Sequence, residues 1–341
     1  MSMTPALSVL LPCYNATDTL EETLLSLAGQ TFPDFEVVAI DDGSTDTTLK
    51  ILQAWEQRDR RFRAVNISHK GIITALNIGL GLCRAAYVAR MDADDHALPR
   101  RFERQMAFLY EHPETAVVSC LVTGFPEKHM RQGARIYIDW LNSLISDEDI
   151  RREIFVESPL AHPSVIFRKR WVEQVGMYQE NGWPEDYDLW QRLYLEGARF
   201  EKVPEVLLEW REYPQRLTRT DDRYSKENFL RLKAFYLCRG PLRGREAVIL
   251  WGAGMMGRRL SKHLLRQEAP LVGFIDIDPH KIGHTRRGLP VLPPIELLTL
   301  WKRYSHPALL VAVGARGARA LIRARLLEMG LREGEDFWCV A

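Results

Sequence analysis

Polar and acidic residues gather at three places in the first hundred residues, and each place directly follows an apolar run. The segments are PCYN at 12–15, DDGSTD at 41–46 and DADD at 92–95. An Asp-x-Asp pair at a strand end suits Mg²⁺ or Mn²⁺, which take oxygen ligands and are commonly held by one or two carboxylates together with substrate phosphates. A divalent cation bound to a nucleotide diphosphate is therefore the expected chemistry.

Each cluster also has a simpler interpretation when it is taken alone. DGSTD is typical of an Asp/Gly/Ser turn that caps the following helix, and DADD is typical of a solvated loop. Their occurrence at successive strand ends favours a shared site, because the carboxyl ends of parallel strands converge on one crevice.

The elements that must position these clusters follow from the apolar pattern. The runs LSVLLP, FEVVAID and AYVARMD do not alternate, which predicts strands buried on both faces of a parallel sheet. Between the first two, Asp18 and Glu21 form a capping-box pattern for a helix that ends at Gly29. The alternation through about residue 95 predicts an α/β fold, and longer helical patterns follow at 99–111, 186–196 and 222–238.

Length and composition favour two folded domains. The chain has 341 residues, of which 46% are hydrophobic, and this composition excludes a largely disordered protein. A Gly/Pro-rich linker at 239–245 divides a predicted domain at 1–240 from a smaller α/β domain at 245–341. The five cysteines form no CxxC pair and are expected to be reduced thiols. No apolar run approaches the roughly 18 residues of a membrane span, so we expect a cytoplasmic protein.

The net charge of +1 conceals two unlike halves. Residues 1–241 hold 30 basic and 36 acidic side chains, whereas residues 242–341 hold 16 and 9. The first half is therefore acidic and the second basic. One hypothesis is that the basic half makes peripheral contact with anionic lipid at the inner face of the cell membrane, or with a lipid-diphosphate acceptor.

Seven ordered segments within about residues 6–215 resemble the inverting nucleotide-sugar glycosyltransferases of family 2, which have the GT-A fold. The segments are LSVLLPCYN, VVAIDDGSTDTT, KGIITALNIGL, YVARMDADD, PRRFERQ, AHPSVIFRK and WPEDYDLWQRL. The resemblance implies a GT-A nucleotide-sugar-binding fold for this region. The smaller Rossmann-like domain after residue 245 is predicted separately, from its own motifs, and lies outside the family pattern.

The resemblance also implies how the donor is bound. In the family, the opening strand and its PxYN segment hold the base and ribose, paired acids recognise the uracil, and the Asp-x-Asp motif lies near the ribose and the metal. The implied donor-binding residues are Pro12, Cys13, Tyr14, Asn15, Asp41, Asp42, Lys70, Asp92 and Asp94, with Asp94 on the metal. Asn77 flanks this pocket, and Asp95 is a third acid.

The same resemblance implies a general base. A Glu-Asp pair before a helix supplies it in the family, which matches Glu185 and Asp186, with Asp186 as the catalytic residue. Inversion at the anomeric carbon requires a base on the face opposite the leaving diphosphate. A helix N-cap is the alternative role for Asp186.

Four further residues extend the predicted site. His162 in AHPS lines the acceptor side, and Arg211 or Arg216, in a segment that often closes over the donor, reaches the diphosphate. Arg90 pairs with the acid cluster. A packed histidine and solvated arginines are the alternatives.

The C-terminal domain carries a G-x-G-x-x-G turn between an apolar run and a helix. Its residues are Gly252, Gly254 and Gly257, with Asp276 at the end of the next apolar run. This order fits a dinucleotide fingerprint, although the domain is only about half of a full two-fold nucleotide-binding domain. Bound NAD(P), a nucleotide or nucleotide-sugar, and a ligand-free assembly module remain alternatives.

The predicted function is metal-dependent, inverting transfer of a sugar from a UDP-linked donor to a hydroxyl of a glycan or lipid-linked acceptor in bacterial surface polysaccharide synthesis. Its cofactor is Mn²⁺ or Mg²⁺, its partners include no nucleic acid, and the chain can form oligomers. The alternatives are a bifunctional enzyme whose C-terminal domain modifies the same sugar, and a non-catalytic nucleotide-sugar-binding assembly protein.

Overall fold

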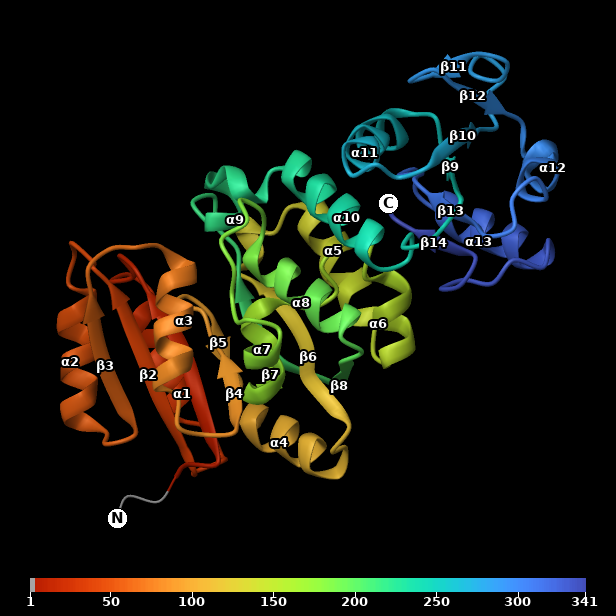
Figure 1. Cartoon of the computed structure of the whole chain (residues 1–341). Helices are drawn as coiled ribbons and strands as arrows, with labels where there is room; N and C mark the ends of the chain where they lie inside the picture. Colours follow the sequence, from red (N-terminus) through yellow and green to blue (C-terminus); the bar gives the residue numbers. More distant parts are fainter. Residues whose placement is uncertain (1–3) are drawn as a thin grey trace. The chain divides into compact units, whose positions relative to one another are not determined.

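The computed structural model describes residues 4–341, which form two compact units interleaved in the sequence (Figure 1). Unit 1 comprises the described residues up to 150 together with 159–181 and 185–220. Unit 2 comprises 151–158, 182–184 and 221–341. The linker predicted at 239–245 lies inside unit 2, because the helix that precedes it groups with that unit.

Unit 1 is built on an eight-stranded sheet in the order β3-β2-β1-β4-β7-β6-β8-β5. The strands are β1 (Leu7–Cys13), β2 (Phe35–Asp42), β3 (Phe62–Ile67), β4 (Tyr87–Arg90), β5 (His96–Ala97), β6 (Thr115–Phe125), β7 (Ile166–Arg168) and β8 (Arg199–Arg211). The first four are mutually parallel, and β7 runs antiparallel to both β4 and β6. The sheet is therefore mixed, and the neighbouring strands β3, β2, β1 and β4 form its parallel half.

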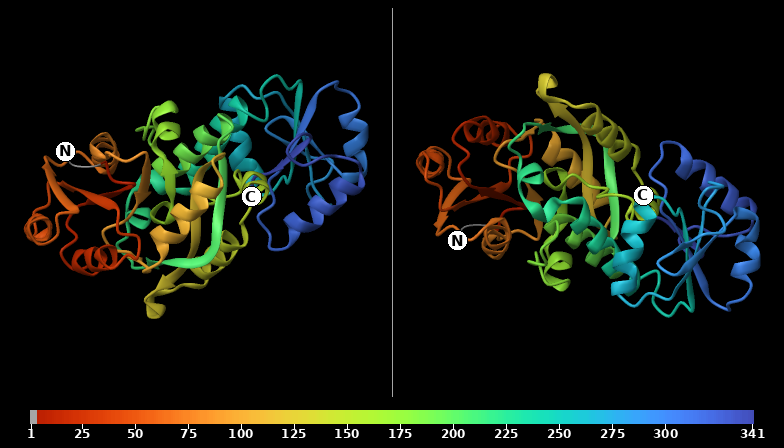
Figure 2. Two further views of the ribbon diagram at one scale, coloured as in Figure 1. Left: turned by 90° about the horizontal axis from the view of Figure 1, so that it is seen from below. Right: turned by 90° about the horizontal axis from the view of Figure 1, so that it is seen from above.

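Helices cover both faces of that parallel half. The helices of unit 1 are α1 (Leu20–Ala28), α2 (Thr48–Arg58), α3 (Ile72–Leu82), α4 (Arg101–Glu111), α5 (Gln132–Ser143), α7 (Lys169–Gln174), α8 (Glu185–Leu195) and α9 (Leu217–Thr220), while α6 (Asp147–Glu153) spans the change of unit. Val9 and Val37 pack in one core with α1 and α2, whereas Leu10 and Ile40 face α3. The alternation of side chains along each strand thus supplies both cores, and Figure 2 gives two further views of this layering.

The start of α1 differs from the predicted capping box, which is wrong. The helix begins at Leu20, and its N-cap Thr19 makes no capping hydrogen bond with its side chain. Thr19 Oγ1 instead donates to the carbonyl of Ala93 (3.0 Å), and Glu21 accepts a hydrogen bond from the indole of Trp55 (2.8 Å). Of the two side chains that the local pattern assigned to the cap, Glu21 is therefore bound to a tertiary partner. The predicted end at Gly29 is confirmed.

Unit 2 has a six-stranded sheet in the order β11-β12-β10-β9-β13-β14. Its strands are β9 (Ala247–Trp251), β10 (Leu271–Ile275), β11 (Thr285–Arg286), β12 (Leu289–Leu292), β13 (Pro307–Val311) and β14 (Phe337–Cys339). Its helices are α10 (Lys226–Arg239), α11 (Met255–Arg266), α12 (Leu297–Trp301) and α13 (Ala318–Glu328). The central strand β9 pairs in parallel with β10 and β13, and α10 packs on α11.

The two short segments that join unit 2 from earlier in the chain are held by polar and aromatic contacts. Glu153, which is 4% exposed, forms ion pairs with Arg319 (3.0 Å) and Arg323 (2.6 Å). Trp183 packs on Phe235 with ring centroids 5.2 Å apart. These contacts make the segments part of the folded core of unit 2.

Two predictions about the chain as a whole can be compared with the structure. All five cysteines are free, as expected. Over residues 4–341, none of the helices combines the length and the apolar character needed to cross a membrane.

Helix α3 lies close against the sheet at one glycine. A Cβ added at Gly79 would lie 2.3 Å from Leu10 Cδ1 and 2.9 Å from Ile40 Cγ1, whereas Gly81 on the same helix has open space around it. We predict that Gly79→Ala lowers the free energy of unfolding by about 1–3 kcal/mol through overpacking. Gly81→Ala should leave it unchanged or raise it by up to about 1 kcal/mol, because alanine favours the helix.

Thermal unfolding of the two glycine variants, followed by circular dichroism, measures the difference. Equal midpoints for the two variants would contradict the close approach of α3 to the sheet.

Candidate active site

The three polar clusters lie at one edge of the sheet of unit 1. Strands β2, β1 and β4 are neighbours, and Cys13 pairs with Asp41 in register. Leu10 pairs with Arg90, so the chain beyond β4 runs past the end of β1. The structure thus brings together the segments that the sequence placed at successive strand ends.

Three carboxylates beyond β4 form a compact acidic cluster. One oxygen from each of Asp92, Asp94 and Asp95 lies within 4.8 Å of the others, and Asp95 is 1% exposed. Burial and the neighbouring carboxylates raise the pKa of Asp94, and they raise that of Asp95 further. Asp95 Oδ2 is buried and has no hydrogen-bond partner among residues 4–341. A cluster of hard oxygen donors that repel one another fits a divalent cation.

A buried arginine faces the cluster from the last position of β4. Arg90 is 2% exposed and forms an ion pair with Asp92, which confirms the pairing expected from the sequence. Its main chain is also fixed: the amide of Arg90 donates to the carbonyl of Val165 (3.0 Å), and its own carbonyl accepts from Arg101 (2.9 Å). The main chain that carries this guanidinium is therefore held in place by two neighbouring segments.

Strand β8 and the residues after it close the other side of the cluster. The amide of Arg211 donates to Asp95 Oδ1 (2.7 Å), and its guanidinium donates to the carbonyl of Asp94 (2.6 Å) and pairs with Glu22. The guanidinium also lies over the ring of Phe125 at 4.5 Å. Arg211 was predicted to line the donor site. In the structure its guanidinium is bound to protein groups, and its contacts with Asp94 and Asp95 help to position the acidic cluster.

Two residues further along the chain face the cluster directly. Tyr213 hydrogen-bonds Asp94, which together with burial raises the pKa of the phenol. Arg216 lies over Trp210 at 4.6 Å and pairs with Glu212 (3.2 Å), and its charge partly opposes the rise in the pKa of Asp94 and Asp95 that burial causes. Tyr213 lies in the segment that the resemblance placed over the donor, but no local pattern singled out this residue.

The paired acids after β2 have different roles in the structure. Asp42 accepts hydrogen bonds from the amides of Lys70 (2.8 Å) and Gly71 (2.9 Å) and pairs with His69 (2.9 Å). Its carboxylate therefore holds the segment at the start of α3. Asp41 accepts from the amide of Ser44 (3.3 Å), and its other oxygen is buried with no partner in the described chain.

The PCYN segment forms a wall next to these acids. Tyr14 is 47% exposed and stacks on His69 with centroids 4.2 Å apart. Asn15 accepts a hydrogen bond from the amide of Thr45 (2.9 Å) and so joins the ends of β1 and β2. Pro12 is the penultimate residue of β1, and the side chain of Lys70 is exposed. An exposed aromatic ring beside a free buried acceptor can bind a planar heterocycle.

The predicted base lies at the start of α8. Burial and the carboxylate of Glu185 raise the pKa of Asp186 to about 7, against the opposing effects of the Tyr187 amide (2.7 Å) and Arg90. Asp188, two residues on, is fully buried and pairs with Arg192 (2.7 Å). Of the two aspartates, Asp186 is the one suited to accept a proton near neutral pH.

His162 is a packed histidine. Its Nε2 is 2.8 Å from the hydroxyl of Tyr178, and its ring lies edge-on to Trp190 at 5.8 Å. Burial, with a smaller effect of Arg90, lowers the pKa of His162 well below its usual value, so the ring is neutral. Asn77 exchanges two hydrogen bonds with the main chain of Tyr178 (2.9 and 3.0 Å) and thereby holds α3 to this segment.

Comparison with known proteins identifies the family. The model of glycosyl transferase family 2 matches residues 8–176. The amylovoran biosynthesis glycosyltransferase AmsE of Erwinia amylovora is 34% identical over 207 residues, which are 60% of this chain and 75% of that protein. The chain belongs to glycosyltransferase family 2.

Other proteins resemble this family 2 chain at lower identity. The UDP-Gal:alpha-D-GlcNAc-diphosphoundecaprenol beta-1,3-galactosyltransferase of Escherichia coli is 29% identical over 217 residues, 61% of this chain and 74% of that protein. TarS 1–349 of S. aureus, solved with UDP-GlcNAc, has a TM-score of 0.57 at 21% identity. The match covers 76% of this chain and 72% of the TarS chain. The chain spans 40% of a longer TarS structure. The similarity to TarS confirms the GT-A fold.

The glycine turn of unit 2 lies outside the family 2 match and is tightly packed. A Cβ at Gly257 would lie 1.7 Å from the carbonyl of Gly252, which itself has a φ of 118°. Asp276 accepts hydrogen bonds from the amides of Ala253 (2.8 Å) and Asp278 (3.0 Å). The glycines thus allow a close turn, and both oxygens of Asp276 are bound within it. Nucleotide binding by Gly252, Gly254, Gly257 and Asp276 stays a prediction.

The ion pair of Arg90 can be tested against an exposed pair in the same family 2 unit. We predict that Arg90→Met lowers the free energy of unfolding by about 2–4 kcal/mol, because it leaves Asp92 without its partner; the lower part of this range is favoured since Asp92 is 27% exposed. Arg100→Gln, which removes an exposed pair with Glu103, should cost less than about 1 kcal/mol.

Urea denaturation followed by tryptophan fluorescence measures both variants. Similar losses for the two would show that Arg90 has no special structural role.

Proposed function

We propose that this family 2 chain transfers a sugar, with inversion, from a nucleotide-diphosphate donor to a hydroxyl group of a glycan or lipid-linked acceptor. The observation that carries the proposal is the presence of two separate carboxylate sites, one a cluster of three acids and the other a carboxylate next to Glu185. The acidic cluster at Asp92, Asp94 and Asp95 needs a cation, whereas Asp186 has a pKa of about 7 and can exchange a proton. Arg90 influences both sites electrostatically.

The donor is best described as a UDP-sugar. The ring of Tyr14 provides a surface for stacking a base, and the free oxygen of Asp41 can accept a hydrogen bond from an imide N–H such as that of uracil. Asp42 contributes by holding the segment that carries His69. TarS bound to UDP-GlcNAc and the UDP-Gal-dependent relative of Escherichia coli support this choice.

The oxygens of Asp94, with those of Asp92 and Asp95, would hold Mn²⁺ or Mg²⁺. When bound, the ion supplies positive charge that stabilises the departing diphosphate. Arg216 is a second protein cation, besides Arg90, that faces the same cluster, and Tyr213 fixes the orientation of Asp94 through its hydroxyl.

The reaction follows from the position of the base. Asp186 takes the proton of the acceptor hydroxyl while the acceptor oxygen forms a bond to the anomeric carbon. The bond between that carbon and the diphosphate oxygen breaks, and the nucleotide diphosphate leaves with the electron pair. Because attack and departure are on opposite faces, the configuration inverts, and no covalent enzyme intermediate forms.

The biological setting is proposed from the relatives. AmsE is named for amylovoran biosynthesis, and the relative of Escherichia coli acts on a diphosphoundecaprenol-linked sugar. We place this chain in the synthesis of a surface polysaccharide, on the cytoplasmic face of the membrane, where a lipid-linked acceptor would be reached.

Replacing the base should separate catalysis from binding. We predict that Asp186→Asn lowers the rate of transfer by about 10²–10⁴-fold, while the affinity for UDP stays within about twofold. Transfer is measured by release of UDP from a panel of UDP-sugars, and affinity by calorimetry. Glu196→Gln, an exposed site just after α8, is the matched control. Retained turnover in Asp186→Asn would eliminate this residue as the base.

Metal dependence has its own test. We predict that UDP binds the wild-type chain at least about tenfold more tightly with Mn²⁺ than with EDTA, and that Asp94→Asn removes most of this difference. Calorimetry of both proteins in both buffers measures it. Equal affinity with and without Mn²⁺ would contradict the role of Asp94 as a ligand, whereas failure to bind UDP at all would contradict the donor assignment.

A further inference from the structure

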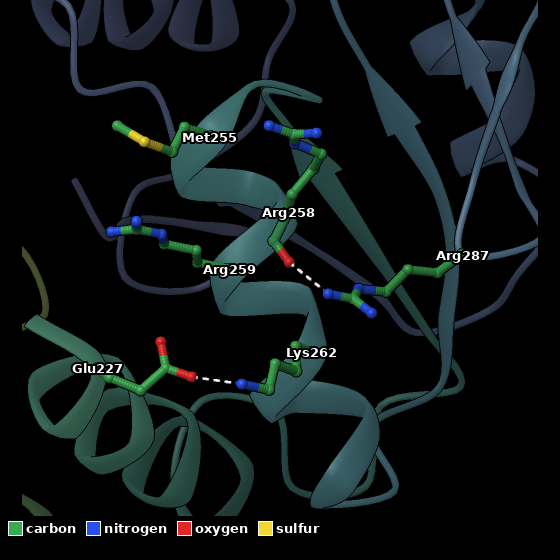
Figure 3. Close-up of a pocket in the computed structure, with 6 residues that line it drawn as sticks. All are labelled: Glu227, Met255, Arg258, Arg259, Lys262 and Arg287. Atoms are coloured by element: carbon green, nitrogen blue, oxygen red, sulfur yellow. Dashed lines mark hydrogen bonds and ion pairs between the residues drawn. The ribbon is translucent and has the colours of Figure 1, made fainter.

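Unit 2 has a basic pocket on the exposed side of α11, with a volume of about 440 Å³. Its lining residues are Glu227, Met255, Arg258, Arg259, Lys262 and Arg287 (Figure 3). Four of these six side chains are cations and one is an acid, so the lining has a formal charge of +3. We refer to it as the α11 pocket.

Helix α11 separates this pocket from the core of unit 2. Met255, Arg258, Arg259 and Lys262 have the i, i+3, i+4, i+7 spacing of one helical face. Leu260 and Leu264, by contrast, are fully buried. Because the opposite face is packed against the core, the helix fixes the spacing of the cationic side chains.

Arg287 reaches the pocket from the turn between β11 and β12 and is held there. Its Nε donates to Ser261 Oγ (3.0 Å), and its Nη2 donates to the carbonyl of Arg258 (2.8 Å), as Figure 3 shows for the latter. The main chain at Arg287 has a φ of 52°, in the left-handed region. The turn therefore places this guanidinium beside the helix, and its partners there are neutral groups.

The acid of the pocket neutralises only part of this charge. Glu227 pairs with Lys262 (2.5 Å) and with His263 (3.0 Å). No carboxylate within residues 4–341 forms an ion pair with Arg258, Arg259 or Arg287 in the structure. Three guanidinium groups around one pocket repel one another, and an anion bound among them would relieve that repulsion.

We propose that the α11 pocket binds a diphosphate group. Guanidinium groups bind phosphate oxygens through paired, charge-assisted hydrogen bonds, and three of them match a group with two phosphates better than a single carboxylate. The volume lies in the range of pockets that hold a ligand with an organic portion. Met255, which is 59% exposed, supplies an apolar contact for that portion.

The α11 pocket is distinct from the glycine turn. At the turn, the carboxylate of Asp276 is bound by two main-chain amides and paired with Lys281 (3.4 Å). Arg258, Arg259 and Arg287, the three arginines for which the described chain provides no ion pair, take no part in those contacts. The diphosphate can come from a soluble nucleotide or from a lipid diphosphate, and the proposal does not depend on the function proposed for unit 1.

Calorimetry with inorganic pyrophosphate tests the proposal on the full-length chain. EDTA is included so that the acidic cluster of unit 1 holds no cation and repels the probe. Wild-type protein should bind pyrophosphate, and the double variant Arg258→Gln/Arg259→Gln should weaken binding by about tenfold or more. The double variant Arg266→Gln/Arg325→Gln removes the same charge from exposed sites elsewhere in unit 2 and should stay within about twofold of the wild type.

Two further arms identify the source of the diphosphate. In the first arm, the protein is sedimented with phosphatidylcholine vesicles that contain an undecaprenyl diphosphate lipid. Co-sedimentation of the protein, and its release from the vesicles by pyrophosphate, would indicate the lipid source. Binding of UDP with EDTA, lost in Arg258→Gln/Arg259→Gln, would indicate the soluble source. Absence of pyrophosphate binding, or equal weakening in both double variants, would overturn the proposal, because the second result reports only the net charge of the unit.

Discussion

The ion pair between Arg90 and Asp92 is the constraint on which the rest of unit 1 depends. A guanidinium that is 2% exposed must have an anion next to it, and Asp92 provides that anion at the end of β4. The pair also reduces the repulsion that would otherwise separate the three carboxylates of the acidic cluster. Without it, holding the three acids together would fall to Arg211, Tyr213 and Arg216, which contact or face Asp94 and Asp95.

The field of Arg90 extends beyond the acidic cluster. It contributes to keeping His162 neutral, and it partly offsets the effects of burial on Tyr178 and Asp186. One buried cation therefore affects both the group that would bind a metal and the group that would accept a proton. This coupling means that the two carboxylate sites cannot be treated as independent, even though they lie about ninety residues apart in the chain.

Much of the fold could be predicted because its signals are local. A predominantly apolar, non-alternating run such as FEVVAID is typical of a buried strand. Parallel strands bring their ends to the same edge, so the convergence of the three clusters followed once the strands were recognised. The roles of individual side chains were less accessible. Glu21 binds Trp55 instead of capping its helix, and Arg211 binds Asp94 and Asp95 from 116 or more residues away. Such choices depend on which distant groups arrive nearby, which no local spacing encodes.

The interleaving of the two units has a practical consequence for anyone who wishes to study the family 2 region alone. A truncation at residue 240 would leave 151–158 and 182–184 in the fragment but remove Arg319 and Arg323, the partners of Glu153. The fragment would then carry a buried acid that has lost these two cations and keeps the longer contact with Arg152 (3.9 Å). A shortened protein of this kind would need Glu153 changed to a neutral residue, because a cut at one sequence position divides contacts that lie within unit 2.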